Sequence, residues 1–193
     1  MDYSHILKAL SRHVDLNSEE KRDFTSRLVL KKIEPKEIIL REGEICKYST
    51  FVVKGTLRSY TIDKHGFEHV LNFAPEGWWI ADMYSLLAQK PGVLTIEAME
   101  DSEVFTLSKN DQEQLYLNIP KLERFFRILT ENSLVANQQR LIDNLSLTAQ
   151  ERYFKFCKTY PGLIDKVAQK LVAAYIGVTP EFLSKMKKRI GHG

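Results

Sequence analysis

Four glycines at nearly constant spacing constrain the fold of this chain more than any other feature of its sequence. Gly43, Gly55, Gly66 and Gly77 follow one another at intervals of 12, 11 and 11 residues. Before and between them lie short runs rich in β-branched and aromatic residues, at 37–41, 49–53, 56–62 and 69–73. Strands separated by turn residues at such intervals are typical of an antiparallel sandwich or roll. Two further runs, 94–99 and 103–107, complete the predicted β-unit near Leu107.

Helices are predicted on both sides of the β-unit. Asn17 followed by Glu20 is a capping-box pattern, and a short helical region fits residues 1 to about 29. Ser108 and Asp111 form a second capping signature, ahead of a short helical turn that Pro120 interrupts. Thr148 and Glu151 form a further capping box, which predicts a helix that ends at Tyr160-Pro161-Gly162.

Residues 120–146 contain no glycine and no proline after the first position, which predicts the longest helix of the chain. One face of this helix repeats at spacings of 3, 4, 3, 4 and 3, a heptad-like seam with two polar positions. The seam residues are Phe125, Ile128, Asn132, Val135, Gln139 and Ile142. Such a seam packs on its own domain or on a twin helix. Because the helix is longer than a small β-unit needs, we favour a parallel homodimer.

Charge is divided unevenly along the chain. Residues 148–193 contain nine Lys or Arg and three Asp or Glu, a net charge of +6, whereas the preceding 147 residues carry −3. A basic end on a mildly acidic body is the asymmetry expected when one end meets a polyanion such as DNA. On charge alone, a solvated lysine-rich tail fits equally well.

The segment 169–190 has the pattern of a helix-turn-helix. Small Ala173 lies where two steeply crossing helices would approach, Gly177 lies at the turn, and apolar residues occupy 172, 176, 178, 183 and 186. Thr179 suits the cap of the second helix and Pro180 its first position. The alternative is an ordinary helical hairpin with a solvated lysine face. The residues predicted to contact DNA are Gln169, Lys170, Thr179, Glu181, Ser184, Lys185 and Lys188.

Nearly the whole chain resembles the Crp/Fnr family of regulators. The resemblance rests on the order and spacing of REGE at 41–44, FVVKGTLRSY at 51–60, VLNFAPEGWWIAD at 70–82 and EV at 103–104, followed by the long helix and the helix-turn-helix. It implies a cyclic-nucleotide-binding β-roll, a dimerisation helix and a winged helix, with RNA polymerase as a possible partner. The chain ends at Ile190-Gly-His-Gly, so we expect a reduced or absent wing.

The resemblance also implies where a ligand would lie, and there this sequence departs from the family. The family's cyclic-nucleotide cassette has a Gly-Glu pair for the ribose and, ten residues after the Glu, an Arg for the phosphate. Those positions here hold Ala81, Asp82 and Gly92. Without the arginine we expect no cofactor and disfavour cyclic AMP. Either another effector occupies the pocket or Trp79, Met83 and Val93 fill it. The complete predicted pocket is Leu71, Asn72, Trp79, Ala81, Asp82, Met83, Gly92 and Val93.

The recognition helix departs from the family pattern as well. Glu181 is retained, whereas Pro180 and Lys185 replace two arginines of the pattern. We therefore expect an operator sequence that differs from the family's best-known one.

Other function classes find little support in the sequence. No paired carboxylates, nucleophile elbow or phosphate loop stands out, so we expect no enzyme. The five histidines do not converge with acids or cysteines, and we expect no metal site. Cys46 and Cys157 have no disulfide or metal spacing and are expected to be reduced thiols. The N-terminus lacks an apolar export segment, and the longest apolar stretch, 171–178, is far shorter than a membrane span. We expect a cytoplasmic protein.

Together these features predict an α+β chain in three parts. Residues 1–119 form an antiparallel β-roll of the cyclic-nucleotide-binding type with N-terminal helices, 120–146 the dimerisation helix, and 147–193 the helix-turn-helix domain. The predicted function is sequence-specific binding of double-stranded DNA by a homodimer that senses an unknown effector. The alternative is a ligand-binding module that acts through protein contacts without binding DNA.

Overall fold

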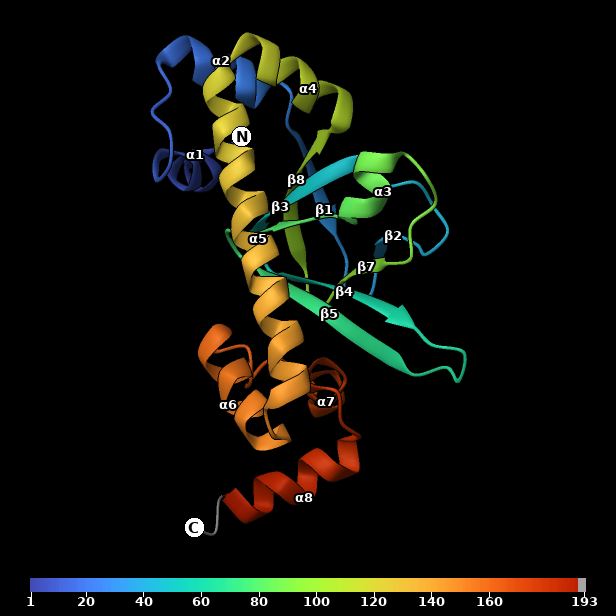
Figure 1. Ribbon diagram of the computed structural model, residues 1–193. Helices are drawn as coiled ribbons and strands as arrows, with labels where there is room; N and C mark the ends of the chain where they lie inside the picture. The colour runs from blue at the N-terminus through green and yellow to red at the C-terminus, as the bar shows by residue number, and fades with distance from the viewer. Residues whose placement is uncertain (191–193) are drawn as a thin grey trace. The chain divides into compact units, whose positions relative to one another are not determined.

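The computed structural model describes residues 1–190, which form eight α-helices and eight β-strands (Figure 1). The helices are α1 Ser4–Ser11, α2 Ser18–Ser26, α3 Met83–Ala88, α4 Lys109–Asn118, α5 Pro120–Ser146, α6 Ala149–Thr159, α7 Gln169–Ile176 and α8 Pro180–Ile190. The strands are β1 Val29–Ile33, β2 Ile38–Leu40, β3 Tyr48–Lys54, β4 Thr56–Ile62, β5 Glu68–Pro75, β6 Trp79–Ile80, β7 Thr95–Ala98 and β8 Ser102–Ser108.

The chain divides into two compact units, and each consists of two separate stretches. The first unit holds residues 1–61 and 72–131, and the second holds residues 62–71 together with the chain from 132 onward. The division falls inside α5 and inside the β4–β5 hairpin, whereas the sequence analysis placed its boundaries at 119 and 146. The predicted fold class is confirmed: an antiparallel β-roll, a long helix and a C-terminal helix-turn-helix.

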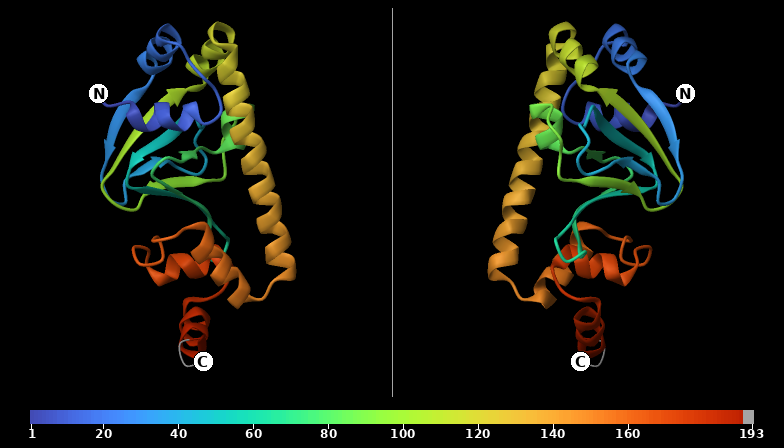
Figure 2. Two further views of the ribbon diagram at one scale, coloured as in Figure 1. Left: turned by 90° about the vertical axis from the view of Figure 1, so that its left-hand side faces the viewer. Right: turned by 90° about the vertical axis from the view of Figure 1, so that its right-hand side faces the viewer.

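Two antiparallel four-stranded sheets form the β-roll of the first unit. Their strand orders are β1-β8-β3-β6 and β2-β7-β4-β5 (Figures 1 and 2). Apolar side chains from the facing sides of the sheets fill the space between them, including Val52, Leu57, Ile96 and Val104. β1 and β6 were missed by the sequence analysis, which extended the helical region to about residue 29 and assigned no strand at Trp79–Ile80.

A second core lies between the first sheet and the helices that cover its outer face. Phe51 and Phe105 of the sheet are buried there with Leu10 of α1, Phe24 of α2 and Phe125 of α5. The predicted N-terminal helical region is two helices, because the backbone leaves the helix after Ser11 and starts again behind the Asn17 cap.

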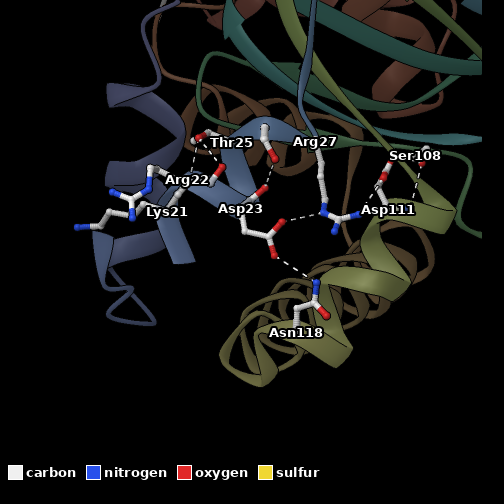
Figure 3. Close-up of polar contacts among 9 residues, drawn as sticks. Lys21, Arg22, Asp23, Thr25, Arg27, Ser108, Asp111 and Asn118 are labelled. Atoms are coloured by element: carbon white, nitrogen blue, oxygen red, sulfur yellow. Dashed lines mark hydrogen bonds and ion pairs between the residues drawn. The ribbon is translucent and has the colours of Figure 1, made fainter. Parts of the chain in front are cut away.

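Polar contacts join α2 to α4 at the edge of this core (Figure 3). The Arg27 guanidinium pairs with Asp23 at 3.1 Å and with Asp111 at 3.2 Å, and Asn118 donates to Asp23 at 3.3 Å. These carboxylates hold the pKa of Arg27 above its usual value, mainly through the Asp23 hydrogen bond. Ser108 caps α4 by accepting from the Asp111 amide, as the sequence predicted.

The capping boxes at the starts of α2 and α6 are confirmed. Asn17 Oδ1 accepts from the Glu19 and Glu20 amides, and the Glu20 carboxylate accepts from the Asn17 amide. Thr148 and Glu151 exchange the same pair of bonds at α6. Caps of this kind contribute about 1 kcal/mol each and fix where a helix begins.

Candidate nucleic-acid interface and ligand pocket

The C-terminal helices have the geometry of a helix-turn-helix. α7 ends at Gly177, whose φ of 74° lies in the left-handed region that favours glycine, and the Val178 amide donates to the Ala173 carbonyl across the turn. Ala173 is fully buried where the predicted close approach lies, with Ile176 of α7 and Leu183 of α8. The Thr179 hydroxyl accepts from the Phe182 amide and so caps α8. Four of the five apolar positions predicted to lie inside the motif are therefore confirmed as buried, and Val178 is partly buried.

All seven residues predicted to contact DNA are exposed. Gln169 and Lys170 lie in the first turn of α7, and Thr179 lies at the turn between the helices. Glu181, Ser184, Lys185 and Lys188 lie along the solvent face of α8. The buried side of α8 is formed by Leu183 and Met186, so the helix turns its charged residues away from its own core. Phe182, half exposed beside Glu181, adds an aromatic side chain that the sequence analysis did not single out.

A partly buried arginine organises the second unit. The Arg140 guanidinium of α5 donates to the carbonyls of Val70, Leu71 and Tyr175, and it stacks on the Tyr175 ring at 4.0 Å from the ring centre. Burial lowers the pKa of Arg140 from its usual value. Arg140 therefore ties β5 residues of this unit to α5 and α7, a role that no sequence pattern indicated.

Two more polar contacts fix α6 within the second unit. The Arg152 guanidinium donates to the carbonyls of Leu147 and Ile176 at 2.7 and 2.9 Å. Lys155 pairs with Asp143 of α5 at 2.6 Å, and this bond lowers the pKa of Asp143 below its usual range. Through α6, these bonds connect α7 to the end of α5.

The predicted seam of α5 splits into a buried half and an exposed half. Phe125 is 1% exposed and belongs to the first unit's core, where it packs edge-on against Phe126. We therefore assign Phe125 to the core and not to an interface. Ile128 is partly buried, whereas Asn132, Val135, Gln139 and Ile142 are exposed. The sequence alone could not make this division, because a seam repeats in the same way whichever surface covers it.

An apolar stripe runs along the exposed half of α5. The positions repeat at helical spacing and therefore share one face. Its residues are Leu134, Val135, Leu141, Ile142 and Leu145, each between 47% and 80% exposed. Contiguous exposed apolar surface of this kind marks an interaction site more often than an ordinary solvent face.

In the predicted ligand cassette, the Asp82 side chain accepts hydrogen bonds from the protein's own backbone. Its carboxylate accepts from the amide of Ser85 at 3.0 Å and from the amides of Val93 and Leu94 at 3.2 Å each. Asp82 is 2% exposed and caps α3. Gly92 packs against this carboxylate so closely that a Cβ at position 92 would lie 2.3 Å from Asp82 Oδ2. A side chain at position 92 therefore has no room there.

The remaining predicted pocket residues are dispersed. Trp79 packs between Phe51 and Phe126 in the edge strand β6, with ring centres 5.3 and 5.2 Å apart. Met83 and Val93 are 42% and 58% exposed, so the expectation that they fill a pocket is wrong for the single chain. Ala81 and Asn72 are partly buried, and the Leu71 carbonyl accepts from Arg140 in the second unit.

Ser85 holds the cassette loop together, and the sequence analysis did not identify this role. Its fully buried hydroxyl donates to the Lys90 carbonyl at 2.6 Å and accepts from the Cys46 amide at 2.8 Å. Together with Asp82, Ser85 closes residues 82–94 into a hydrogen-bonded loop. A lone serine after a helix cap carries no sequence signal for such a role.

Residues 1–190 contain neither a candidate metal site nor a helix that could span a membrane. No three His, Cys, Asp or Glu side chains in this range gather closely enough to hold a metal ion. None of the helices in the same range has both the length and the apolar character needed to cross a bilayer. Cys46 and Cys157 are free thiols. His192 and the segment on which the wing prediction rests lie beyond Ile190, outside the described residues.

The part of the chain that forms the β-roll matches a known protein family. Residues 30–118 match the cyclic nucleotide-binding domain family. This range covers β2 to β8 and α4, and with them the cassette at 81–93. The match supports the likeness that the sequence analysis drew for the β-roll.

Two curated relatives are similar in sequence to most of the chain. A curated protein of Lacticaseibacillus casei, named "Probable transcriptional regulator flp", is 26% identical over 91% of this chain and 82% of its own length. Electron transport regulator A of Shewanella oneidensis is 23% identical over 82% of this chain and 67% of its own length. Both relatives are named as regulators.

Solved structures share the fold. The c-di-GMP-responsive global regulator CLP of Xanthomonas campestris aligns with a TM-score of 0.74 at 13% identity, over 91% of this chain and 92% of that one. FixK2 of Bradyrhizobium japonicum aligns with a TM-score of 0.73 at 20% identity, over 86% of this chain and 85% of that one. The fold of most of this chain thus recurs in these solved structures.

Proposed function

We propose that this protein is a dimeric, sequence-specific DNA-binding transcription regulator of the Crp/Fnr type. The observation that carries the proposal is the helix-turn-helix of α7 and α8, whose inner positions are buried and whose predicted reading face is exposed. In such motifs the N-terminal part of the second helix enters the major groove. Glu181 there can accept a hydrogen bond from cytosine, and Lys185 can donate to guanine or phosphate.

The exposed stripe of α5 supports the dimeric part of the proposal. A parallel twin helix would cover Val135, Ile142 and Leu145, which a lone chain leaves in water. A two-fold dimer then prefers a pseudo-palindromic operator with half-sites about 34 Å apart. Contact with RNA polymerase remains an expectation from the family resemblance, and a regulator of this kind would act in the cytoplasm.

The effector we propose is not cyclic AMP. The side chains at the cassette do not fit a cyclic nucleotide, because the Asp82 carboxylate is already bonded to three backbone amides and Gly92 supplies no cation. A cyclic phosphate moved from water into this loop would keep its charge without a partner, which is strongly unfavourable. Titration calorimetry with cyclic AMP and cyclic GMP tests this point, and a micromolar or tighter dissociation constant for either would contradict it.

Selection from a random double-stranded DNA library tests the DNA-binding proposal. We expect recovery of a pseudo-palindrome and a fall in affinity of several orders of magnitude as salt rises from about 50 to 200 mM. If no sequence is enriched and no salt-dependent binding is seen, with or without cell extract as a source of effector, the proposal fails. The alternative, a ligand-binding module that acts through protein contacts, would then be preferred.

A further inference from the structure

A cavity of about 490 Å³ opens at one edge of the β-roll, where the edge strands β1 and β2 leave the two sheets unjoined. All of its lining residues belong to the first unit. They are Lys31, Ile33, Ile39, Leu40, Glu44, Ile45, Cys46, Lys47, Tyr48, Thr50, Ile96, Val104 and Thr106. None of the eight residues of the predicted cyclic-nucleotide pocket is among them, so this is a different site.

The interior of this edge cavity is apolar with a hydroxyl group in its wall. Ile33, Leu40, Ile96 and Val104 line it and are each at least nine-tenths buried. Thr50 also lines it, is 4% exposed, and its hydroxyl has no hydrogen-bond partner within residues 1–190. A hydroxyl that faces a cavity and has no partner in the protein is available to a ligand.

The mouth of the edge cavity is cationic. Lys31 and Lys47 line it, and neither ammonium group forms an ion pair with any residue of the described chain. Lys31 instead lies over the Tyr48 ring, 5.2 Å from its centre. The neighbouring Glu44 carboxylate accepts from the Arg41 amide at 3.0 Å. The mouth therefore presents two positive charges that form no ion pair and one negative charge that already accepts a backbone hydrogen bond.

We propose that the edge cavity binds an amphiphilic organic anion, with its carboxylate between Lys31 and Lys47 and its apolar body between the sheets. A volume of about 490 Å³ falls within the range of about 300–1,000 Å³ typical of small-molecule sites. The Thr50 hydroxyl selects a ligand whose apolar body carries a hydrogen-bonding group. This inference does not rest on DNA binding, and it stands or fails separately from the proposed function.

Three ten-carbon compounds test the three parts of the site by calorimetric titration of the full chain. Decanoate carries the charge, decan-1-ol lacks it, and 10-hydroxydecanoate adds a hydroxyl to the apolar end. We expect saturable binding of one molecule of decanoate per chain, several-fold tighter than that of decan-1-ol. We expect 10-hydroxydecanoate to bind at least as tightly as decanoate, although its hydroxyl must leave water.

Two variants assign these preferences to the proposed residues. The double variant Lys31→Ala, Lys47→Ala should lose the preference for decanoate over decan-1-ol, whereas the control Lys8→Ala, Lys64→Ala, which removes two exposed lysines elsewhere, should keep it. Thr50→Val, which keeps the shape and removes the hydroxyl, should make 10-hydroxydecanoate bind more weakly than decanoate.

Methyl resonances of the wild-type protein locate the ligand without any substitution. Decanoate should shift the signals of Ile33, Ile96 and Val104 and leave those of Leu10 and Leu115 in the other core unchanged. The inference is overturned if decanoate does not saturate, if these cavity methyls do not shift, or if the Lys31, Lys47 variant keeps the full preference for the anion.

Discussion

The backbone of Gly92 packs directly against the carboxylate of Asp82. A Cβ built on Gly92 would lie 2.3 Å from Asp82 Oδ2 and 2.9 Å from Ser85 Cβ, and no positive φ is involved. Glycine is thus required at position 92 because a larger side chain would clash, and not because of the backbone conformation. The two cassette positions in which this chain departs from the family pattern therefore fit each other, since the space beside Gly92 is taken by the Asp82 carboxylate.

Gly92→Ala should therefore destabilise the protein by about 1–3 kcal/mol through overpacking. Asp82→Ala should cost about 2–4 kcal/mol, because three backbone amides lose their acceptor. Since removing the carboxylate also removes the main obstacle to a Cβ, the double variant should cost less than the sum. Urea unfolding measures all three, with the exposed Val93→Ala as control. Additive losses would show that the two residues do not constrain each other.

Replacing Arg140 should weaken the second unit. Arg140→Met leaves the carbonyls of Val70, Leu71 and Tyr175 without their donor, and we expect a loss of about 2–4 kcal/mol. Arg140→Lys should recover only part, because an ammonium cannot reproduce the planar fork. Hydrogen exchange of residues 132–190 reports the change. Arg127→Met, which removes an exposed pair with Glu131, should cost less than about 1 kcal/mol. An unchanged Arg140→Met protein would contradict the role given to the guanidinium.

A charge on the α5 stripe should separate the dimer without unfolding the chain. Val135 is 65% exposed, so Val135→Glu leaves the chain's own packing intact but buries an unpaired charge in a helix pair. Light scattering should show monomers for Val135→Glu and dimers for Asn144→Glu, whose exposed side chain lies on another face of α5. A wild type that is already monomeric at micromolar concentration would refute the interface.

Two substitutions on α8 should affect DNA binding in different ways. Lys188→Ala should weaken binding to all sequences and reduce the salt dependence, because a phosphate contact carries no sequence information. Glu181→Ala should instead relax the preference at one base pair per half-site, by about 1–3 kcal/mol of discrimination. Fluorescence anisotropy with the selected operator and its single-base variants measures both. If both substitutions lower affinity uniformly, the assigned roles are wrong.

Acid should destabilise the hairpin between β4 and β5. The hydrogen bond from His69, followed by that from the Phe67 amide, lowers the pKa of Asp63 to about 2. Because the unfolded chain has the ordinary aspartate value of about 3.9, the ionised carboxylate stabilises the fold above pH 4. This contribution is lost as the pH falls from about 4 through 2. Carboxyl titration by NMR should give the low pKa, and Asp63→Asn should remove that part of the acid dependence, whereas Asp101→Asn should not.

Local patterns in the sequence predicted much of the fold, since they depend on neighbouring residues. The bounds of α5 match the uninterrupted run at 120–146, and the caps at Asn17, Ser108 and Thr148 lie where their patterns indicated. The buried positions of the helix-turn-helix follow from the same periodicity. β1 was missed because its burial pattern does not alternate regularly, and β6 because it has only two residues.

The features that sequence reasoning missed depend on residues far apart in the chain. Phe125 and Val135 both belong to the predicted seam, yet one is buried in a core and the other is exposed. Arg140 bonds to carbonyls 35 and 70 residues away, and backbone carbonyls carry no residue identity to read. The edge cavity exists because two sheets end side by side, which no single strand pattern reveals.

The second unit joins residues 62–71 to the chain from 132 onward, with Arg140 bonded to both parts. This discontinuity limits how such a protein can exchange parts with its relatives. A recombination event where the second unit begins, near Asn132, would import a new Arg140 and new C-terminal helices but keep the old hairpin residues that Arg140 binds. A chimera that takes the whole second unit from one parent must therefore also take the ten residues 62–71 from that parent. We therefore expect the exposed face of α8 to diverge by substitution more readily than by transfer of a whole unit.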